Sequence, residues 1–75
     1  MTLKNLKPGA HASIVDIDLQ NTMRCRLMEL GLTPGVKISM VRAAPLGDPI
    51  EIALRGYRLT LSKEDASHVR CEALR

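Results

Sequence analysis

The side chains in this chain that are best suited to chemistry are two histidines, two cysteines and eight carboxylates. A metal site gathers such ligands through short fixed spacings, for example His-x-x-x-His or Cys-x-x-Cys. The candidate ligands are the carboxylates with His11, Cys25, His68 and Cys71, and they form no cluster of this kind. We therefore expect no metal site and no cofactor in this chain.

The two cysteines are expected to differ. Cys71 has the inward parity of a predicted strand, where a thiol behaves as a small hydrophobic group. Cys25 lies between Arg24 and Arg26 near a predicted helix start, where positive charge favours the thiolate. Two interpretations of Cys25 are therefore kept, an ordinary thiol and a reactive thiol. Two cysteines this far apart do not suggest a disulfide framework, so reduced thiols are expected.

Nucleophilic catalysis and phosphate binding have no sequence support. No serine has a histidine and an acid arranged around it, and no pair of carboxylates is placed for acid and base work. The glycines each fit a turn, and none belongs to the Gly-x-x-x-x-Gly-Lys pattern that cradles phosphates. We therefore expect a protein that is not an enzyme.

Composition narrows the class further. The 75 residues predict a single domain over 1–75, with a core of aliphatic side chains because Trp and Phe are absent and Tyr57 is the only aromatic residue. Single-stranded nucleic acid and proline-rich peptides both need aromatic platforms, so neither is an expected ligand despite the net charge of +3. No apolar run reaches the roughly 20 residues of a membrane span, and no secretion signal is evident. A cytoplasmic location is therefore expected.

The segment from Arg26 to Gly35 predicts a helix end followed by a sharp turn. A left-handed Gly31 lets Leu32 pack back onto Leu27. Pro34 and Gly35 suit the two central positions of a type II turn, after which a strand begins.

The helix before this turn is expected to open near Asp18 to Asn21, with Asp18 or Asn21 as its cap. Met23, Leu27 and Leu30 then form one stripe facing the core.

Alternating hydrophobic residues predict five short strands. Their inward residues, in chain order, are Ala12 with Ile14, Val15 and Ile17; Val36, Ile38 and Met40; Ile50, Ile52 and Leu54; Tyr57, Leu59 and Leu61; and Val69 with Cys71. The change of parity at Ile14-Val15 indicates a bulge. Arg55-Gly56 suits a tight hairpin, and Ser62 to Asp65 resembles a capping box before one helical turn and a last strand from His68 to Glu72. The fold class expected is mainly β, a small barrel with one inserted helix.

Three segments together resemble the FeoA family in order and spacing. They run from Arg26 to Gly35, from Val41 to Ile50, and from Leu59 to Ala66. The resemblance implies an SH3-like barrel that acts in bacterial ferrous iron uptake as a small cytosolic accessory of the FeoB permease. It also implies contact with the cytosolic GTP-binding region of that permease, with the membrane reached only through it. Weak self-association through exposed strands is a further possibility.

A second interpretation is regulatory. A similar domain follows a winged-helix DNA reader and a dimerisation module in iron-dependent repressors of the diphtheria-toxin-repressor type. Neither module occurs in these 75 residues. A complete product that begins at Met1 favours the free-standing accessory, whereas a longer product favours the regulator.

Two surfaces are candidates for partner binding. The first is the loop 43–49 with Pro45, Leu46 and Asp48, in which two prolines restrict the backbone and Leu46 has no obvious core to fill. Alternatively, Leu46 plugs the barrel and Asp48 caps local amides. The second is the helix stripe of Arg24 and Met28. Alternatively, Met28 belongs to the core.

Another set of residues is assigned to structure alone. These are Leu27, Leu30, Gly31, Leu32, Pro34 and Gly35.

Overall fold

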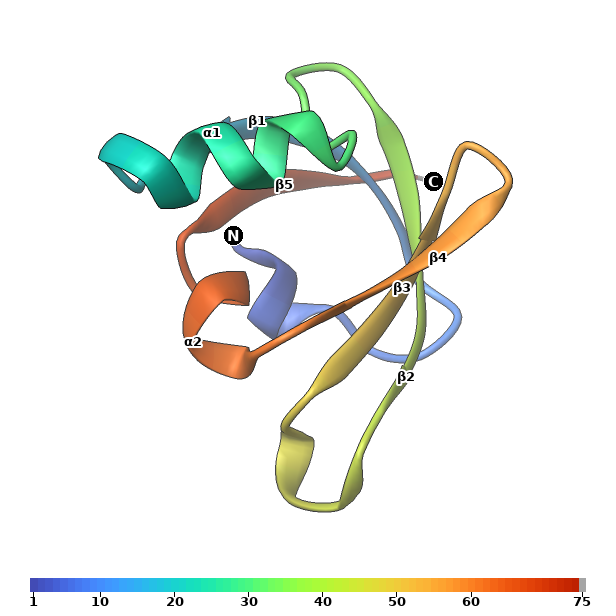
Figure 1. Ribbon diagram of the computed structural model, residues 1–75. Coiled ribbons are helices and arrows are strands. Elements are labelled where there is room, and N and C mark those ends of the chain that lie inside the picture. Colours follow the sequence, from blue (N-terminus) through green and yellow to red (C-terminus); the bar gives the residue numbers. More distant parts are fainter. Residues whose placement is uncertain (75) are drawn as a thin grey trace.

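Five antiparallel strands curl into one strongly curved sheet in the computed structural model, which describes residues 1–74 (Figure 1). The strands are β1 (His11–Ile17), β2 (Lys37–Ala43), β3 (Ile50–Leu54), β4 (Tyr57–Leu61) and β5 (Val69–Leu74), and their order across the sheet is β4-β3-β2-β1-β5. Helix α1 (Asn21–Glu29) follows β1, and the single turn of α2 (Lys63–Ala66) precedes β5. The expected mainly β architecture is confirmed.

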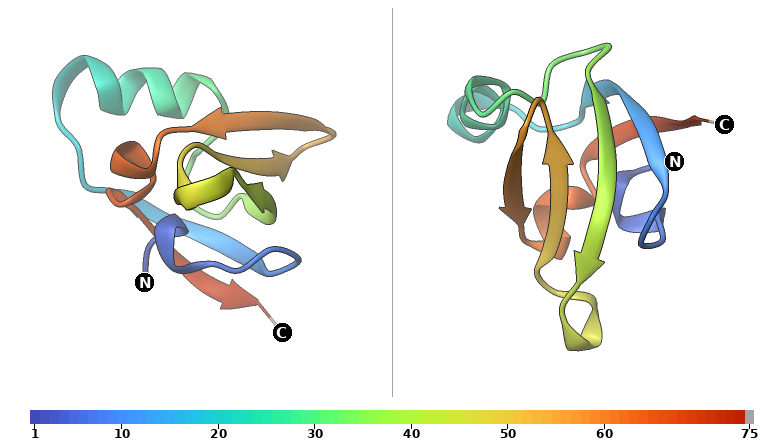
Figure 2. Two further views of the ribbon diagram at one scale, coloured as in Figure 1. Left: turned by 90° about the horizontal axis from the view of Figure 1, so that it is seen from below. Right: turned by 90° about the vertical axis from the view of Figure 1, so that its right-hand side faces the viewer.

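The core lies inside the curve of the sheet, with α1 and α2 beside it (Figure 2). Alternate residues of β2 and β3 point into it, as their sequence alternation predicts. The buried side chains are Leu3, Ala12, Ile14, Ile17, Leu27, Leu32, Val36, Ile38, Met40, Ile50, Ile52, Leu54, Leu61, Ala66, Val69 and Cys71. Within residues 1–74 none of the buried side chains is aromatic or charged.

Strand β1 contains the predicted bulge, because its register with β5 shifts between Ile14 and Asp16. The extra residue at the bulge turns Val15 outward, where its side chain is 38% exposed. Ile14 and Ile17 are both buried on either side of it. The prediction that Val15 points inward is therefore wrong, while the inward position of Ile17 is confirmed.

The end of α1 forms the predicted turn. The Gly31 amide donates to the Met28 carbonyl at 3.0 Å and the Leu32 amide donates to the Leu27 carbonyl at 3.1 Å, the pair of bonds of a Schellman motif. Gly31 has a φ of 108°, a value that favours glycine, and this reversal brings Leu32 into the core beside Leu27. A type II turn follows, in which Gly35 has a φ of 89°.

Only one residue of the predicted helix stripe is buried. Leu27 is 2% exposed, whereas Met23 and Leu30 are each 36% exposed, so the prediction that both face the core is wrong. The reason is the position of α1, which lies along one margin of the curved sheet and not across its concave face (Figures 1 and 2).

The cap of α1 also differs from the prediction. The helix begins at Asn21 with Gln20 at the cap position, and no side chain caps it there. The backbone amide of Asp18 instead bonds to the His68 carbonyl at 2.6 Å, two residues before the cap, so Asp18 is not the cap residue. The side chain of Asn21 lies outside the described part of the structure.

The C-terminal third follows the prediction more closely. Leu54 and Tyr57 close the β3–β4 hairpin around Arg55-Gly56. Tyr57 is 43% exposed because β4 is an edge strand, so its predicted inward position is only partly realised. The Ser62 hydroxyl accepts from the Asp65 amide at 3.0 Å at the start of α2.

Within the described residues, no helix is long and apolar enough to cross a membrane.

Candidate functional site

The loop between β2 and β3 projects beyond the rest of the sheet, at the bottom of Figure 1. It contains the short 3-10 turn Pro45–Gly47, and at its tip Leu46 is 97% exposed. Leu46 has a φ of 72°, a left-handed backbone conformation that is unusual for a leucine. The alternative in which Leu46 plugs the barrel is therefore wrong. We call the segment from Ala44 to Pro49 the tip loop.

Hydrogen bonds fix the conformation of the tip loop. The Ala44 amide donates to the Pro49 carbonyl at 2.9 Å, and the Gly47 amide donates to the Ala44 carbonyl at 2.7 Å. The Asp48 carboxylate accepts from the Lys63 amide at 2.9 Å and so ties the loop to the first residue of α2. Asp48 thus caps a backbone amide, as one of the two interpretations of the loop predicts, while Leu46 stays in solvent.

A cluster of charged residues supports the base of the tip loop. The Glu51 carboxylate accepts from Arg42 at 2.9 Å and from Arg58 at 3.2 Å, which joins three neighbouring strands on the outer face of the sheet. The hydrogen bond from Arg42, followed by that from Arg58, lowers the pKa of Glu51 from its ordinary value, while partial burial opposes the shift. Both guanidinium groups stay exposed.

A hollow of about 300 Å³ lies beside the tip loop, between it and the ends of β3 and β4. Its lining combines the apolar Ala43, Pro45 and Pro49 with the polar Arg42 and Glu51. The projecting Leu46 and this hollow lie at the same end of β3, so one partner surface can engage both.

The second predicted surface, on α1, is less prominent. The Arg24 guanidinium lies 3.9 Å from the Asp16 carboxylate, which Arg70 also approaches at 3.7 Å. Met28 is half-buried and packs against the core. The structure does not bring Arg24 and Met28 together with Pro45, Leu46 and Asp48, and their binding roles stay predictions.

The candidate metal ligands are dispersed. Within residues 1–74, no three His, Cys, Asp or Glu side chains are grouped so that they can hold an ion. His68 lies 3.5 Å from the Glu64 carboxylate, and His11 is exposed at the start of β1. Cys25 is exposed on α1, whereas burial raises the pKa of the Cys71 thiol. Cys71 is thus the buried thiol that its strand parity predicts.

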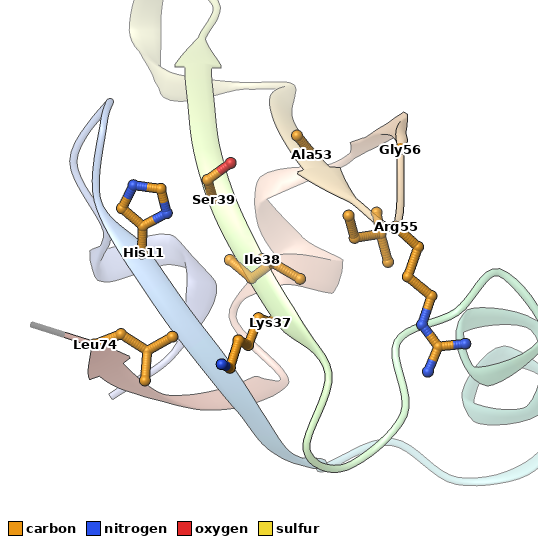
Figure 3. Close-up of a pocket in the computed structure, with 9 residues that line it drawn as sticks. His11, Lys37, Ile38, Ser39, Ala53, Arg55, Gly56 and Leu74 are labelled. Carbon is orange, nitrogen blue, oxygen red and sulfur yellow. The ribbon is translucent and has the colours of Figure 1, made fainter.

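One surface feature was not predicted from the sequence. A groove of about 410 Å³ lies at the opposite end of β3 from the tip loop, where residues of β1, β2, β5 and the β3–β4 hairpin meet (Figure 3). His11 and Leu74 line one side, Arg55 lines the other, and Lys37 lies between them. Only the strand register brings these four residues together, since they are distant in sequence. Of these four residues, only Lys37 and Arg55 stand out in the amino-acid sequence, because they are charged and lie next to hydrophobic strand positions.

Comparison with known proteins identifies the family. The model of the FeoA domain matches residues 1–73. Over 74 residues the chain is 34% identical to the Fe(2+) transport protein A/Fe(2+) transporter FeoB fusion protein of Porphyromonas gingivalis. The matched segment covers 99% of this chain and 9% of the fusion protein. This chain therefore spans less than a tenth of the fusion protein.

Solved structures agree with this match. The solution structure of the FeoA protein of Chlorobium tepidum superimposes with a TM-score of 0.93 at 39% identity, covering 100% of this chain and 71% of that one. The zinc complex of Stenotrophomonas maltophilia FeoA, described as a prokaryotic SH3 domain protein, superimposes with a TM-score of 0.84 at 29% identity. This match covers 96% of this chain and 89% of that one. The expected SH3-like fold is confirmed, and the chain belongs to the FeoA family, whose members are non-enzymatic accessory domains of ferrous iron transport.

Proposed function

We propose that this chain serves bacterial ferrous iron uptake by binding the cytosolic GTP-binding region of a FeoB-type permease. The observation that carries the proposal is the P. gingivalis relative, in which a segment 34% identical to this chain belongs to a FeoA–FeoB fusion. Fusion holds two domains at a high effective concentration. A separate chain needs a docking surface to reach the same association.

The tip loop is the docking surface that we propose. Its hydrogen bonds hold Leu46 in place before a partner arrives, so little conformational entropy is lost on binding. Leu46 is 97% exposed, so covering its apolar side chain with a partner lowers the free energy of the complex. Central apolar anchors of this kind often dominate the binding energy of an interface.

The backbone of Leu46 supports this role. A left-handed conformation costs roughly 1–2 kcal/mol for a residue with a branched side chain, and Gly or Asn adopts it more readily. A leucine that is both strained and exposed contributes little to folding. Its presence is consistent with a contact that becomes useful only in the complex.

The test is a calorimetric titration of this chain against the purified cytosolic region of the FeoB permease of the same organism, with GDP and with a non-hydrolysable GTP analogue. We expect saturable binding by the natural chain and at least tenfold weaker binding by Leu46→Asp, about 1.4 kcal/mol. Met23→Asp is the matched control, because it places the same charge on another exposed apolar residue, in the first turn of α1, where an acid is tolerated.

Three outcomes would contradict the proposal. Absence of binding with either nucleotide would overturn the permease contact itself. Normal binding by Leu46→Asp, together with weak binding by Met23→Asp or Arg24→Ala, would move the contact to α1. Tight stoichiometric uptake in a parallel titration with ferrous iron alone, where we expect none, would give the chain a metal-binding role instead.

A further inference from the structure

The groove at the hairpin end of β3 has a shape that suits an extended chain. Its floor is formed by Ser39 and Ala53, small residues that are direct partners across β2 and β3. Leu74, 39% exposed, and His11 are partners across β5 and β1 and form one wall. Figure 3 shows this floor open between His11 and Leu74 on one side and Arg55 on the other.

The charges around the groove have one sign. Lys37 and Arg55 line it, and no carboxylate does. Within residues 1–74 neither cation forms an ion pair, although elsewhere on the surface Asp16 pairs with Arg24 and Arg70. Among residues 1–74, no carboxylate therefore pairs with the positive charge here, which can attract an anionic group.

Arg55 occupies a position that its residue type disfavours. It is the first central residue of the β3–β4 hairpin and has a φ of 47°, and Gly56 after it has a φ of 84°. Positive φ at both positions defines a type I′ turn, in which Asn-Gly is strongly preferred. An arginine at this site indicates that its guanidinium contributes something other than turn stability.

We propose that this groove binds an acidic segment of a partner protein in an extended conformation. Lys37 and Arg55 bind its carboxylates, Arg55 with the paired donors that suit a carboxylate, while small apolar side chains between the acids pack on Ala53 and Leu74.

A peptide fits this groove better than a free phosphate does. Within the described residues no polar side chain is buried, so the groove lacks the convergent fixed donors of a phosphate site. Its floor is instead made of the small residues Ser39 and Ala53, one wall contributes the apolar Leu74, and the groove runs across four strands.

The groove is separate from the tip loop. Strand β3 separates the two surfaces, and five residues of strand span about 13 Å between their first and last Cα atoms. A partner held at Leu46 leaves the groove free for a second segment.

The test uses a fluorescein-labelled peptide of four Glu-Ala repeats and a matched peptide of four Gln-Ala repeats, with fluorescence anisotropy as the readout. We expect the natural chain to bind the glutamate peptide saturably at low salt, to release it as salt rises, and not to bind the glutamine peptide. Arg55→Asn and Lys37→Gln should each weaken binding about two- to fivefold, and the double variant about tenfold or more.

Arg55→Asn is informative because it creates the preferred Asn-Gly turn. Its thermal midpoint should equal or exceed that of the natural chain, so weaker binding is not a consequence of unfolding. Lys63→Gln is the charge-matched control, because Lys63 is an exposed cation of α2 at the other end of β4.

The proposal is overturned if Arg55→Asn binds as the natural chain does, or if Lys63→Gln weakens binding equally, which would indicate a general charge effect. Displacement of the peptide by inorganic phosphate at similar concentration would assign the groove to small anions. Preferential binding to phosphatidylserine vesicles, reduced by the same variants, would assign it to a membrane. Leu46→Asp should bind the peptide normally, so failure of the permease contact and failure of this groove are distinguishable.

Discussion

Two turns of this protein contain similar residues but place their leucines in opposite environments. The turn after α1 and the tip loop each contain a leucine beside a glycine with positive φ, and each contains proline. Leu32 in the first is fully buried, whereas Leu46 in the second is 97% exposed.

The order of the two residues explains the difference. After α1 the glycine comes first, so Gly31 makes the left-handed reversal and Leu32 is carried back over the helix into the core. In the tip loop the leucine comes first, and Leu46 itself adopts the left-handed conformation while the chain turns away from the core. One turn therefore stabilises the fold, whereas the other leaves its leucine in solvent.

Truncating the two leucines should separate these roles most strongly. Leu32→Ala should lower the free energy of unfolding by about 2–5 kcal/mol, through lost burial and a residual cavity, and Leu27→Ala should act similarly. Leu46→Ala should change it by less than about 0.5 kcal/mol. Urea denaturation followed by far-ultraviolet circular dichroism measures all three, and equal losses for Leu32 and Leu46 would contradict the comparison.

Gly31→Ala should produce the next largest loss. A Cβ at this position would lie 2.7 Å from the Tyr57 hydroxyl and 3.2 Å from Leu54 Cδ1, and its φ of 108° strains any side chain. We expect a loss of about 1–3 kcal/mol in thermal unfolding.

Two further variants separate the causes of that loss. Gly9→Ala is the control for backbone strain, because Gly9 has a φ of 89° but no atom within 4 Å of the added Cβ. Tyr57→Phe removes the closest atom and should restore part of the stability of Gly31→Ala. If Gly9→Ala and Gly31→Ala cost the same, the contact with Tyr57 is unimportant.

Leu46→Asn should have a smaller effect, of opposite sign. Asparagine tolerates the left-handed conformation better than leucine does, so the unfolding free energy should rise by roughly 0.5–1 kcal/mol. Calorimetric affinity for the permease region should fall in the same variant, because the apolar anchor is lost. A variant that is neither more stable nor weaker in binding would remove Leu46 from the comparison.

The ion pairs below the tip loop should give the smallest effect. The pKa of Glu51 is lower in the folded chain than its ordinary value of 4.5, so its ion pairs with Arg42 and Arg58 stabilise the fold fully above pH 4.5. That contribution is lost as the pH falls below 4.5 through the lowered pKa. The difference in thermal midpoint between the natural chain and Glu51→Gln should therefore be small at pH 7 and shrink further towards pH 3. A difference that grows on acidification would contradict the assignment.

Features fixed by neighbouring residues were predictable from the sequence. The turn after α1 follows from the order of Leu27, Gly31 and Leu32, and the bulge follows from the change of parity at Ile14-Val15. The start of α2 follows from Ser62. Each depends on a few consecutive residues and on backbone geometry that those residues impose.

Features that depend on distant segments were not predictable in the same way. Helical spacing places Met23, Leu27 and Leu30 on one stripe, but only the position of α1 at the sheet margin decides that Leu27 alone is buried. The groove requires the registers of β1 with β5 and of β2 with β3. The tip loop was found as a candidate from composition, yet its left-handed Leu46 and the bond from Asp48 to α2 needed the structure.

The position of Tyr57 makes the end of α1 observable by light. The chain contains no Trp and no second Tyr, so its intrinsic near-ultraviolet emission comes from this one phenol. The hydroxyl of that phenol faces Gly31, and no other glycine is approached by it. Loosening of the end of α1 will therefore alter the Tyr57 fluorescence lifetime of an unlabelled sample, whereas motion confined to the distant tip loop will leave this lifetime unchanged.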